Sequence, residues 1–405
     1  MQGYPLLQNE RKGPPLLHWI LFPKRMINLY SDNSLLWYNT MAYFMGRILG
    51  LDGIRAYAVL MVVVTHLHIF IEWHYDRSPL YSLVSGTNGV IIFFILSGFL
   101  ITHLLFLECE KTGTVNLKQF IIRRALRIFP AFYLFILTLF ILGLFVETNT
   151  APKQLFMTAI YWFNHTPRAE YNSILGHTWS LAAEEHFYII WPAIFLLLSK
   201  VKNRNLSIIT VLILMIYSLQ IFQDYIYNET DLNETFRVDR WSSSAAIYLF
   251  SGCLGACFVN SKHWGKISSL QITSVILSFL FIIGFGVDFW FEGDSRVAKY
   301  WRITGILSGI FWVYINQNSR VVSFLEFSPI RYIGTVSYGI YLWQGFFLST
   351  GPNRWVGQEW PLDPTIGLIL LCITVPLSYH LFENKFLKLK DRFRANEIEI
   401  VDQEE

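Results

Sequence analysis

The sequence has few charged residues for its length. Only 15% of its 405 residues are Asp, Glu, Lys or Arg, whereas 53% are hydrophobic and 17% are aromatic. Soluble globular domains carry about 25% charged residues, so this composition excludes an ordinary soluble protein and indicates a polytopic membrane protein. The net charge of +3 at pH 7 is small, and nothing in it suggests a nucleic-acid partner.

The scarcity of cysteine argues against a metal site. The four cysteines form no Cys-x-x-Cys pair, and none is combined with a histidine at metal-ligand spacing. We therefore expect no bound metal and interpret all four as apolar packing residues. They are Cys109, Cys253, Cys257 and Cys372.

No cleavable signal peptide is evident in the sequence, and no internal repeat is apparent. The first fifty residues mix charges and prolines with short apolar pieces, which is typical of a cytosolic arm or an interfacial helix. We expect one domain with two flanking segments. These are a cytosolic or interfacial arm at 1–50, a membrane domain at 51–385 and a charged cytosolic tail at 386–405.

Apolar runs of membrane length are abundant. A transmembrane helix needs roughly twenty such residues, and ten runs approach this length. We therefore predict an all-α fold, a polytopic membrane bundle of about ten transmembrane helices. The runs lie near 51–71, 87–107, 128–146, 179–199, 206–222, 242–260, 270–289, 302–316, 333–350 and 364–382.

The basic residues predict the orientation of this bundle. If the N-terminus lies in the cytosol, the inner segments hold 23 of the 32 Lys and Arg residues and the outer segments hold nine. Cytosolic segments normally carry the excess of Lys and Arg, so both termini are expected in the cytosol. Two Asn-x-Thr sequons, at Asn228 and Asn233, then fall in an outer loop.

Arg55 and His66 form a polar stripe on the first apolar run. Eleven residues of helix rise about 16 Å and rotate about 1,100°, so the two side chains share nearly one face. Arg55 would lie near the cytosolic side and His66 in the outer half. Ionisable groups inside a membrane are usually functional. Alternatively, Arg55 extends to the headgroups and His66 satisfies a backbone carbonyl group.

Three arginines lie just before the third apolar run. Arg123 and Arg127 are four residues apart and share a helix face, with Arg124 beside them. Such a cluster is a common cytosolic anchor, but guanidinium groups also bind phosphate groups in a bidentate manner. The sequence therefore permits a phosphate-bearing cytosolic ligand at this cluster.

Adjacent ionisable residues occur in the fourth run, where Glu184, Glu185 and His186 follow one another. Consecutive helical residues point about 100° apart, so at least one of the three must face the bundle interior. Packing alone does not explain two carboxylates and an imidazole there, and we interpret them as functional. In the second run, Ser97 and Gly98 are expected to permit a close helix approach.

These segments, taken in order over about residues 47–385, resemble the membrane acyltransferase family known as acyltransferase 3. That family includes bacterial O-antigen and peptidoglycan O-acetyltransferases. The ordered set is specific, although each piece alone is not. The matches are Arg55 and His66 for arginine, ten residues and histidine; Phe93 to Phe99 for FFxLSGF; Arg123, Arg124, Arg127, Ile128 and Pro130 for the arginine cluster with I-x-P; Trp179, Ser180, Leu181, Glu184, Phe187 and Tyr188 for WSLxxExxFY; and Ser337, Tyr338, Tyr341 and Leu342 for SYxxYLxH.

The sequence departs from the family pattern at two places. Gln344 stands where the late motif often ends in histidine, so any role of that histidine is absent or replaced. Ile91 and Ile92 precede the second motif, where an acidic residue is frequent. No appended hydrolase-like domain is recognisable, so the membrane domain itself would have to complete the transfer.

The resemblance implies a cytosolic acyl-CoA donor, no permanently bound cofactor, and a hydroxyl acceptor on a glycan or lipid-linked saccharide. It also implies a multi-pass location among the lipids of the bacterial inner membrane. The arginines Arg55, Arg123, Arg124 and Arg127 would hold the phosphates of coenzyme A. His66 would act as general base, or would itself be acylated, and Glu184 would orient its ring. Ser97 and Tyr338 are possible oxyanion donors, and Trp179, Ser180, Tyr188 and Ser337 are possible supporting residues.

Other functions remain compatible with the same stripe. A transporter or flippase would use it to conduct a proton or substrate without forming a bond, although the sequence shows no inverted repeat. A scaffold or receptor has no evident need for so many intramembrane charges. The acceptor could equally be a lipid, a macrolide or a small periplasmic glucan.

Overall fold

The computed structural model describes residues 48–67, 83–145, 150–172, 174–261, 263–290, 296–348 and 364–395. The expected N-terminal arm therefore lies almost entirely outside the described residues. The same applies to the last ten residues of the expected charged tail.

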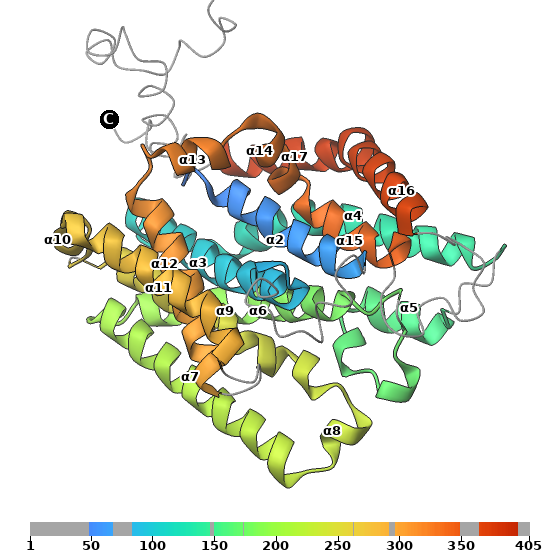
Figure 1. Ribbon diagram of the computed structural model, residues 1–405, viewed down its shortest axis with the longest axis horizontal. Coiled ribbons are helices and arrows are strands. Elements are labelled where there is room, and N and C mark those ends of the chain that lie inside the picture. Colours follow the sequence, from blue (N-terminus) through green and yellow to red (C-terminus); the bar gives the residue numbers. More distant parts are fainter. Residues whose placement is uncertain are drawn as a thin grey trace, which may run out of the picture. The chain divides into compact units, whose positions relative to one another are not determined.

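Helices make up nearly all of these described segments, which contain no strand and one isolated bridge between Pro167 and Phe236. The expectation of an all-α fold is confirmed for them. Each of the ten apolar runs overlaps one of the principal helices (Figure 1). These helices are α2 (Leu51–His66), α3 (Gly86–Thr112), α4 (Leu117–Leu142), α6 (Thr178–Ser199), α7 (Arg204–Glu229), α9 (Ser242–Val259), α11 (Gln271–Trp290), α12 (Arg296–Ile315), α15 (Ser337–Phe347) and α16 (Pro364–Leu377).

Six helical segments of the described chain are long and apolar enough to cross a membrane. They coincide with α3, α4, α6 and α7, with the segment that ends in α9, and with the segment that begins in α16. In contrast, α2 and α15 have 16 and 11 residues, fewer than the roughly twenty of a straight span. The count of about ten spans stays a prediction.

Short helices connect the principal ones. A six-residue π-helical turn, Ser378–Glu383, joins α16 to the amphipathic α17, so the first part of the expected charged tail is helical. The short elements are α5 (Pro152–Ala159), η5 (Phe163–His165), η6 (Arg168–Glu170), α8 (Leu232–Thr235), η7 (Val238–Arg240), α10 (Trp264–Ser268), α13 (Arg320–Leu325), α14 (Ser328–Thr335) and α17 (Asn384–Ala395).

Glycines permit a close helix crossing between α3 and α9. A Cβ atom on Gly98 would overlap the carbonyl group of Leu249, and one on Gly252 would overlap the carbonyl group of Ile95. The two backbones therefore touch without intervening side chains, as small residues allow in membrane helices. This confirms the expected close approach at Gly98.

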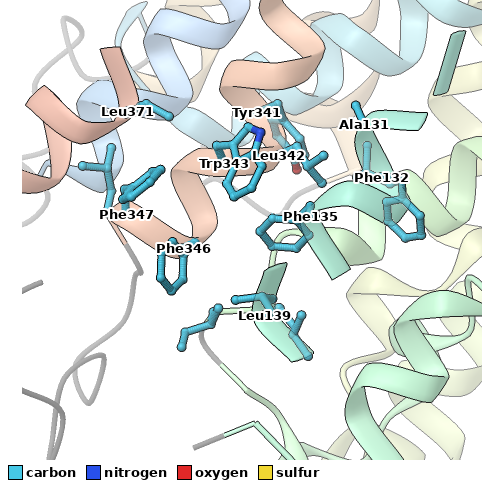
Figure 2. Close-up of a cluster of buried hydrophobic side chains, with 14 of the residues drawn as sticks. Ala131, Phe132, Phe135, Leu139, Tyr341, Leu342, Trp343, Phe346, Phe347 and Leu371 are labelled. Atoms are coloured by element: carbon cyan, nitrogen blue, oxygen red, sulfur yellow. The ribbon is translucent and has the colours of Figure 1, made fainter. Parts of the chain in front are cut away.

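The described residues include two hydrophobic core clusters. One lies between α4 and α15, where Figure 2 shows Phe135 beside Trp343 and Leu342. Val62 and Val63 in the C-terminal half of α2 join this cluster, so it fixes the end of α2 that carries His66. The second cluster joins α3, α6 and α9 around the fully buried Trp191.

Candidate active site

His66 is the last residue of α2, and its ring contacts α15. Its Nδ1 atom is hydrogen-bonded to Oε1 of Gln344. His66 is half-buried, whereas Gln344 is completely buried, and the amide Nε2 of Gln344 has no hydrogen-bond partner in the described segments. The residue that departs from the family pattern is therefore a direct neighbour of the expected base.

His177 lies beside this pair, in the turn that leads into α6. Its buried ring packs edge-on against Phe135 and Tyr341, at centroid distances of 5.8 and 5.7 Å. The ring occupies space that Gly345 leaves open, because a Cβ atom there would overlap it. Burial, with a smaller contribution from the nearby His66, lowers the pKa of His177 to about 3. His177 is therefore neutral at physiological pH.

Sequence reasoning did not single out His177. The available signal was its position two residues before the Trp-Ser-Leu motif of α6. A histidine there is unremarkable without knowledge of the neighbouring helix.

Ser180 and Tyr341 connect the start of α6 to α15. The two hydroxyl oxygens are 2.6 Å apart, and both lie within hydrogen-bond distance of the carbonyl oxygen of His177, at 3.0 Å for Ser180 and 3.2 Å for Tyr341. All three residues are buried. The Ser180 and Tyr341 motif positions therefore hold the turn that presents His177 to His66.

Three arginines gather toward the other end of α2. Arg55 forms an ion pair with Asp52, with 2.9 Å between Nη1 and Oδ1. Arg127 of α4 is close enough to Arg55 and Arg124 for direct electrostatic repulsion. The guanidinium carbon of Arg124 lies 5.6 Å from the Phe120 ring centre and contacts the ring of Tyr188 from α6. We call Arg55, Arg124 and Arg127 the arginine cluster.

Arg123 is not part of the arginine cluster and pairs with Glu108 instead. Its Nη2 donates to Oε2 of Glu108 at 3.0 Å, and the second oxygen of Glu108 accepts from the backbone N–H of Asn116 at 2.7 Å. This contact secures the turn between α3 and α4. The sequence predicted that Arg123 and Arg127 share one helix face. In the structure, Arg124 is the residue that contacts α6, and Arg127 lies close to Arg124.

Glu184 belongs to the arginine end of the site. Its carboxylate accepts from Ser97 at 3.1 Å and from the Tyr188 hydroxyl at 2.8 Å. Arg55 and Arg127 lie within electrostatic range of the same carboxylate. These contacts are with residues other than His66. The expectation that Glu184 orients the ring of His66 stays a prediction.

The neighbours of Glu184 point elsewhere, as the helical geometry predicts. Glu185 is buried and lies within electrostatic range of Arg124. His186 has its Nδ1 atom 2.7 Å from Oγ of Ser242, the first residue of α9. At the start of α15, Ser337 is buried, and the buried hydroxyl of Tyr338 has no hydrogen-bond partner among the described residues.

Arg240 is a further charged residue that sequence reasoning missed. Its guanidinium group donates to the Tyr171 hydroxyl and to the carbonyl oxygen of Gly176, the latter at 3.4 Å. It also lies over the ring of Trp179, 5.9 Å from its centre. A single arginine in an expected outer loop carries no signal of this contact with the start of α6.

The site thus has two ends joined by α2, with the arginine cluster at one and His66, His177 and Gln344 at the other. The first end can hold an anion, and the second presents imidazole nitrogens for proton transfer. Within the described residues, no three His, Cys, Asp or Glu side chains are grouped to hold a metal ion.

Comparison with known proteins shows similarity over most of the chain. The profile of a family described as an acyltransferase domain matches residues 48–383. The chain is 31% identical over 388 residues to the peptidoglycan O-acetyltransferase OatA of Listeria monocytogenes, covering 87% of this chain and 59% of that relative. It is 28% identical over 355 residues to the putative peptidoglycan O-acetyltransferase YrhL of Bacillus subtilis, covering 82% and 54%.

A third relative, the O-acetyltransferase OatA of Staphylococcus aureus, is 28% identical over 363 residues, covering 84% of this chain and 57% of the relative. The chain therefore spans less than two thirds of the length of these three relatives. No solved structure shows significant similarity to it.

Proposed function

The chain belongs to the acyltransferase domain family, and we propose that it is a membrane O-acetyltransferase. It would move an acetyl group from cytosolic acetyl-CoA to a hydroxyl of an extracytoplasmic glycan. The names of three relatives support the choice of acetyl, and two of those names specify peptidoglycan.

The arginine cluster supports the choice of donor. Three guanidinium groups that repel one another are costly to hold together unless an anion joins them, and coenzyme A carries several phosphates. Asp52 and Glu184 compensate part of this positive charge in the described structure. We propose that the phosphates bind at this cluster, with Arg123 securing the adjacent turn.

The distance along α2 supports the path of the thioester, and it is the observation that carries the proposal. Eleven residues separate Arg55 from His66, a rise of about 16 Å, which an extended pantetheine arm can cover. With the phosphates at the arginine cluster, the thioester would lie beside His66. The neutral imidazole would then take the proton of the acceptor hydroxyl, or would first accept the acetyl group itself.

The proposed topology places the two substrates on opposite sides. We propose about ten spans, both termini in the cytosol and a location in the bacterial inner membrane. The excess of Lys and Arg in alternate segments supports this orientation. The acceptor would enter at the His66 end, either as a glycan or as a lipid-linked saccharide from the surrounding membrane.

The direct test uses the purified protein in lipid nanodiscs with labelled acetyl-CoA and soluble peptidoglycan fragments. We expect thiol release coupled to a labelled ester on the fragment, and loss of both with His66→Ala that is folded by circular dichroism. Transfer by His66→Ala at the unmodified rate would overturn the catalytic assignment. Movement of acetyl-CoA or glycan across sealed vesicles without thiol release would instead identify a transporter.

A further inference from the structure

Gln344 occupies an unusual position for an amide side chain. It is completely buried and one end of its amide contacts the ring of His66, while the other end, Nε2, meets no acceptor among the residues that the structure describes. Buried amide donors are almost always paired, because an unpaired donor loses its hydration without compensation. The free Nε2 group beside the expected base therefore points to an acceptor atom supplied by a ligand.

The bonded end of the amide determines the protonation of His66. Oε1 of glutamine can only accept a hydrogen bond, so the Nδ1 atom of His66 must carry the proton. The lone pair of a neutral His66 is then on Nε2, on the opposite side of the ring. Gln344 thereby selects the tautomer in which His66 Nε2 can act as a base.

We propose that Gln344 is a catalytic residue of the acetyl transfer, orienting His66 through Oε1 and donating a hydrogen bond from Nε2 to the thioester carbonyl oxygen. This inference rests on the proposed function. It also accounts for the departure from the family's late motif, because a single neutral side chain supplies both contacts.

The acetyl transfer begins with attack by the acceptor. The acceptor hydroxyl oxygen attacks the thioester carbonyl carbon, and its proton moves to Nε2 of His66. The carbonyl oxygen becomes an oxyanion that accepts from Nε2 of Gln344. When the C–S bond breaks, the imidazolium returns the proton to the departing thiolate, which leaves as coenzyme A, and the ester remains on the acceptor.

Within the described part of the chain, the titratable groups near His66 can be named. His177 is the near one, and it is neutral. Among the described helices, α3, α13, α14 and α15 pack most extensively against α2, and α15 carries Tyr338 and Tyr341 but no charged residue or histidine. The ionisable side chains of the other three are His103, Glu108, Cys109, Glu110 and Lys111 in the second half of α3, Arg320 in α13, and Arg331 with Tyr332 in α14 near the start of α2.

Two substitutions separate the two contacts. Gln344→Glu keeps an acceptor for the Nδ1 proton but removes the N–H donor, whereas Gln344→Leu removes both. The first measurement, made without acetyl-CoA, is the carbethoxylation of His66 by diethyl pyrocarbonate across pH, followed by peptide mass spectrometry. The second is kcat for acetyl transfer to peptidoglycan fragments at the pH optimum of each variant.

We expect Gln344→Glu to shift the midpoint of the carbethoxylation curve upward by about one pH unit, because a carboxylate stabilises the imidazolium. We expect its kcat to fall about 100-fold, as after loss of one oxyanion donor. Gln344→Leu should change the carbethoxylation curve and also reduce kcat by about 100-fold or more.

Two results would contradict the proposal. An unchanged kcat in Gln344→Glu would remove the donor role, and an unchanged carbethoxylation curve in Gln344→Leu would remove the orienting role. If the unmodified protein transfers no acetyl group, the proposed function fails. The carbethoxylation curves still decide whether Gln344 governs His66, because they require no donor or acceptor.

Discussion

The guanidinium group of Arg124 lies over the ring of Tyr188, with its central carbon 5.7 Å from the ring centre. The hydroxyl of the same tyrosine donates to Glu184 at 2.8 Å. One aromatic side chain of α6 therefore supports a cation of α4 and a carboxylate of its own helix. This arrangement couples the proposed phosphate site to the polar residues in the centre of the bundle.

Removing the ring of Tyr188 is expected to weaken donor binding. In Tyr188→Ala, the loss of a cation–π contact worth about 0.5–2 kcal/mol should raise the KM for acetyl-CoA by roughly 2- to 30-fold. Tyr188→Phe is the matched control, since it keeps the ring and loses only the hydroxyl. Steady-state kinetics that show equal KM values for the two variants would contradict this role of the ring.

Arg127→Ala is expected to raise the KM for acetyl-CoA more than it lowers kcat. A charge-assisted hydrogen bond contributes about 1.5–3 kcal/mol, so the increase should be roughly 10-fold or more. Lys118→Ala is a suitable control, because this exposed lysine lies at the start of the same helix. Calorimetric titration with coenzyme A checks the result. An unchanged affinity of Arg127→Ala for coenzyme A would favour the alternative that these arginines only anchor the protein at the membrane.

Gly98→Ala is expected to destabilise the bundle. The added methyl group would overlap the backbone carbonyl of Leu249, so α3 and α9 must separate at a cost of about 1–3 kcal/mol. Gly265→Ala is the control, because a Cβ atom at that position meets no atom within 4 Å. Thermal unfolding in detergent, followed by circular dichroism, should show a lower midpoint for Gly98→Ala alone.

The protein is expected to lose stability in mild acid through His177. Its folded-state pKa of about 3 lies below the ordinary unfolded value near 6.5, so the unfolded state binds the proton first. The contribution of His177 is fully present above pH 6.5 and declines as the pH falls below that value, by at most about 1.4 kcal/mol per pH unit. His177→Gln should make the free energy of unfolding less steep between pH 6.5 and 5. An unchanged slope in chemical denaturation at these pH values would show that His177 is not the responsible group.

Some local features of the candidate site could be predicted from the order of residues along the chain. Arg55 and His66 were expected on one face of one helix because their spacing alone determines their angular separation. The divergence of Glu184, Glu185 and His186 followed from the same geometry. The proximity of Gly98 to a neighbouring backbone followed from the absence of a side chain, although its partner Leu249 could not be named.

Contacts between distant segments were not accessible in this way. Nothing near Arg123 in the sequence indicates that Glu108 would pair with it, because the pairing depends on how the turn at 113–116 returns the chain. The choice of Arg124 to contact Tyr188 depends likewise on the packing of α4 against α6.

The sequence by itself determined that the chain is helical and apolar and that it carries the polar stripe of Arg55 and His66. Composition and helical periodicity are local properties. Only the tertiary structure placed Gln344 and His177 around His66, since those three residues come from three separate segments. Their meeting depends on the hydrophobic packing of α15 against α2 and α4, which no local spacing encodes.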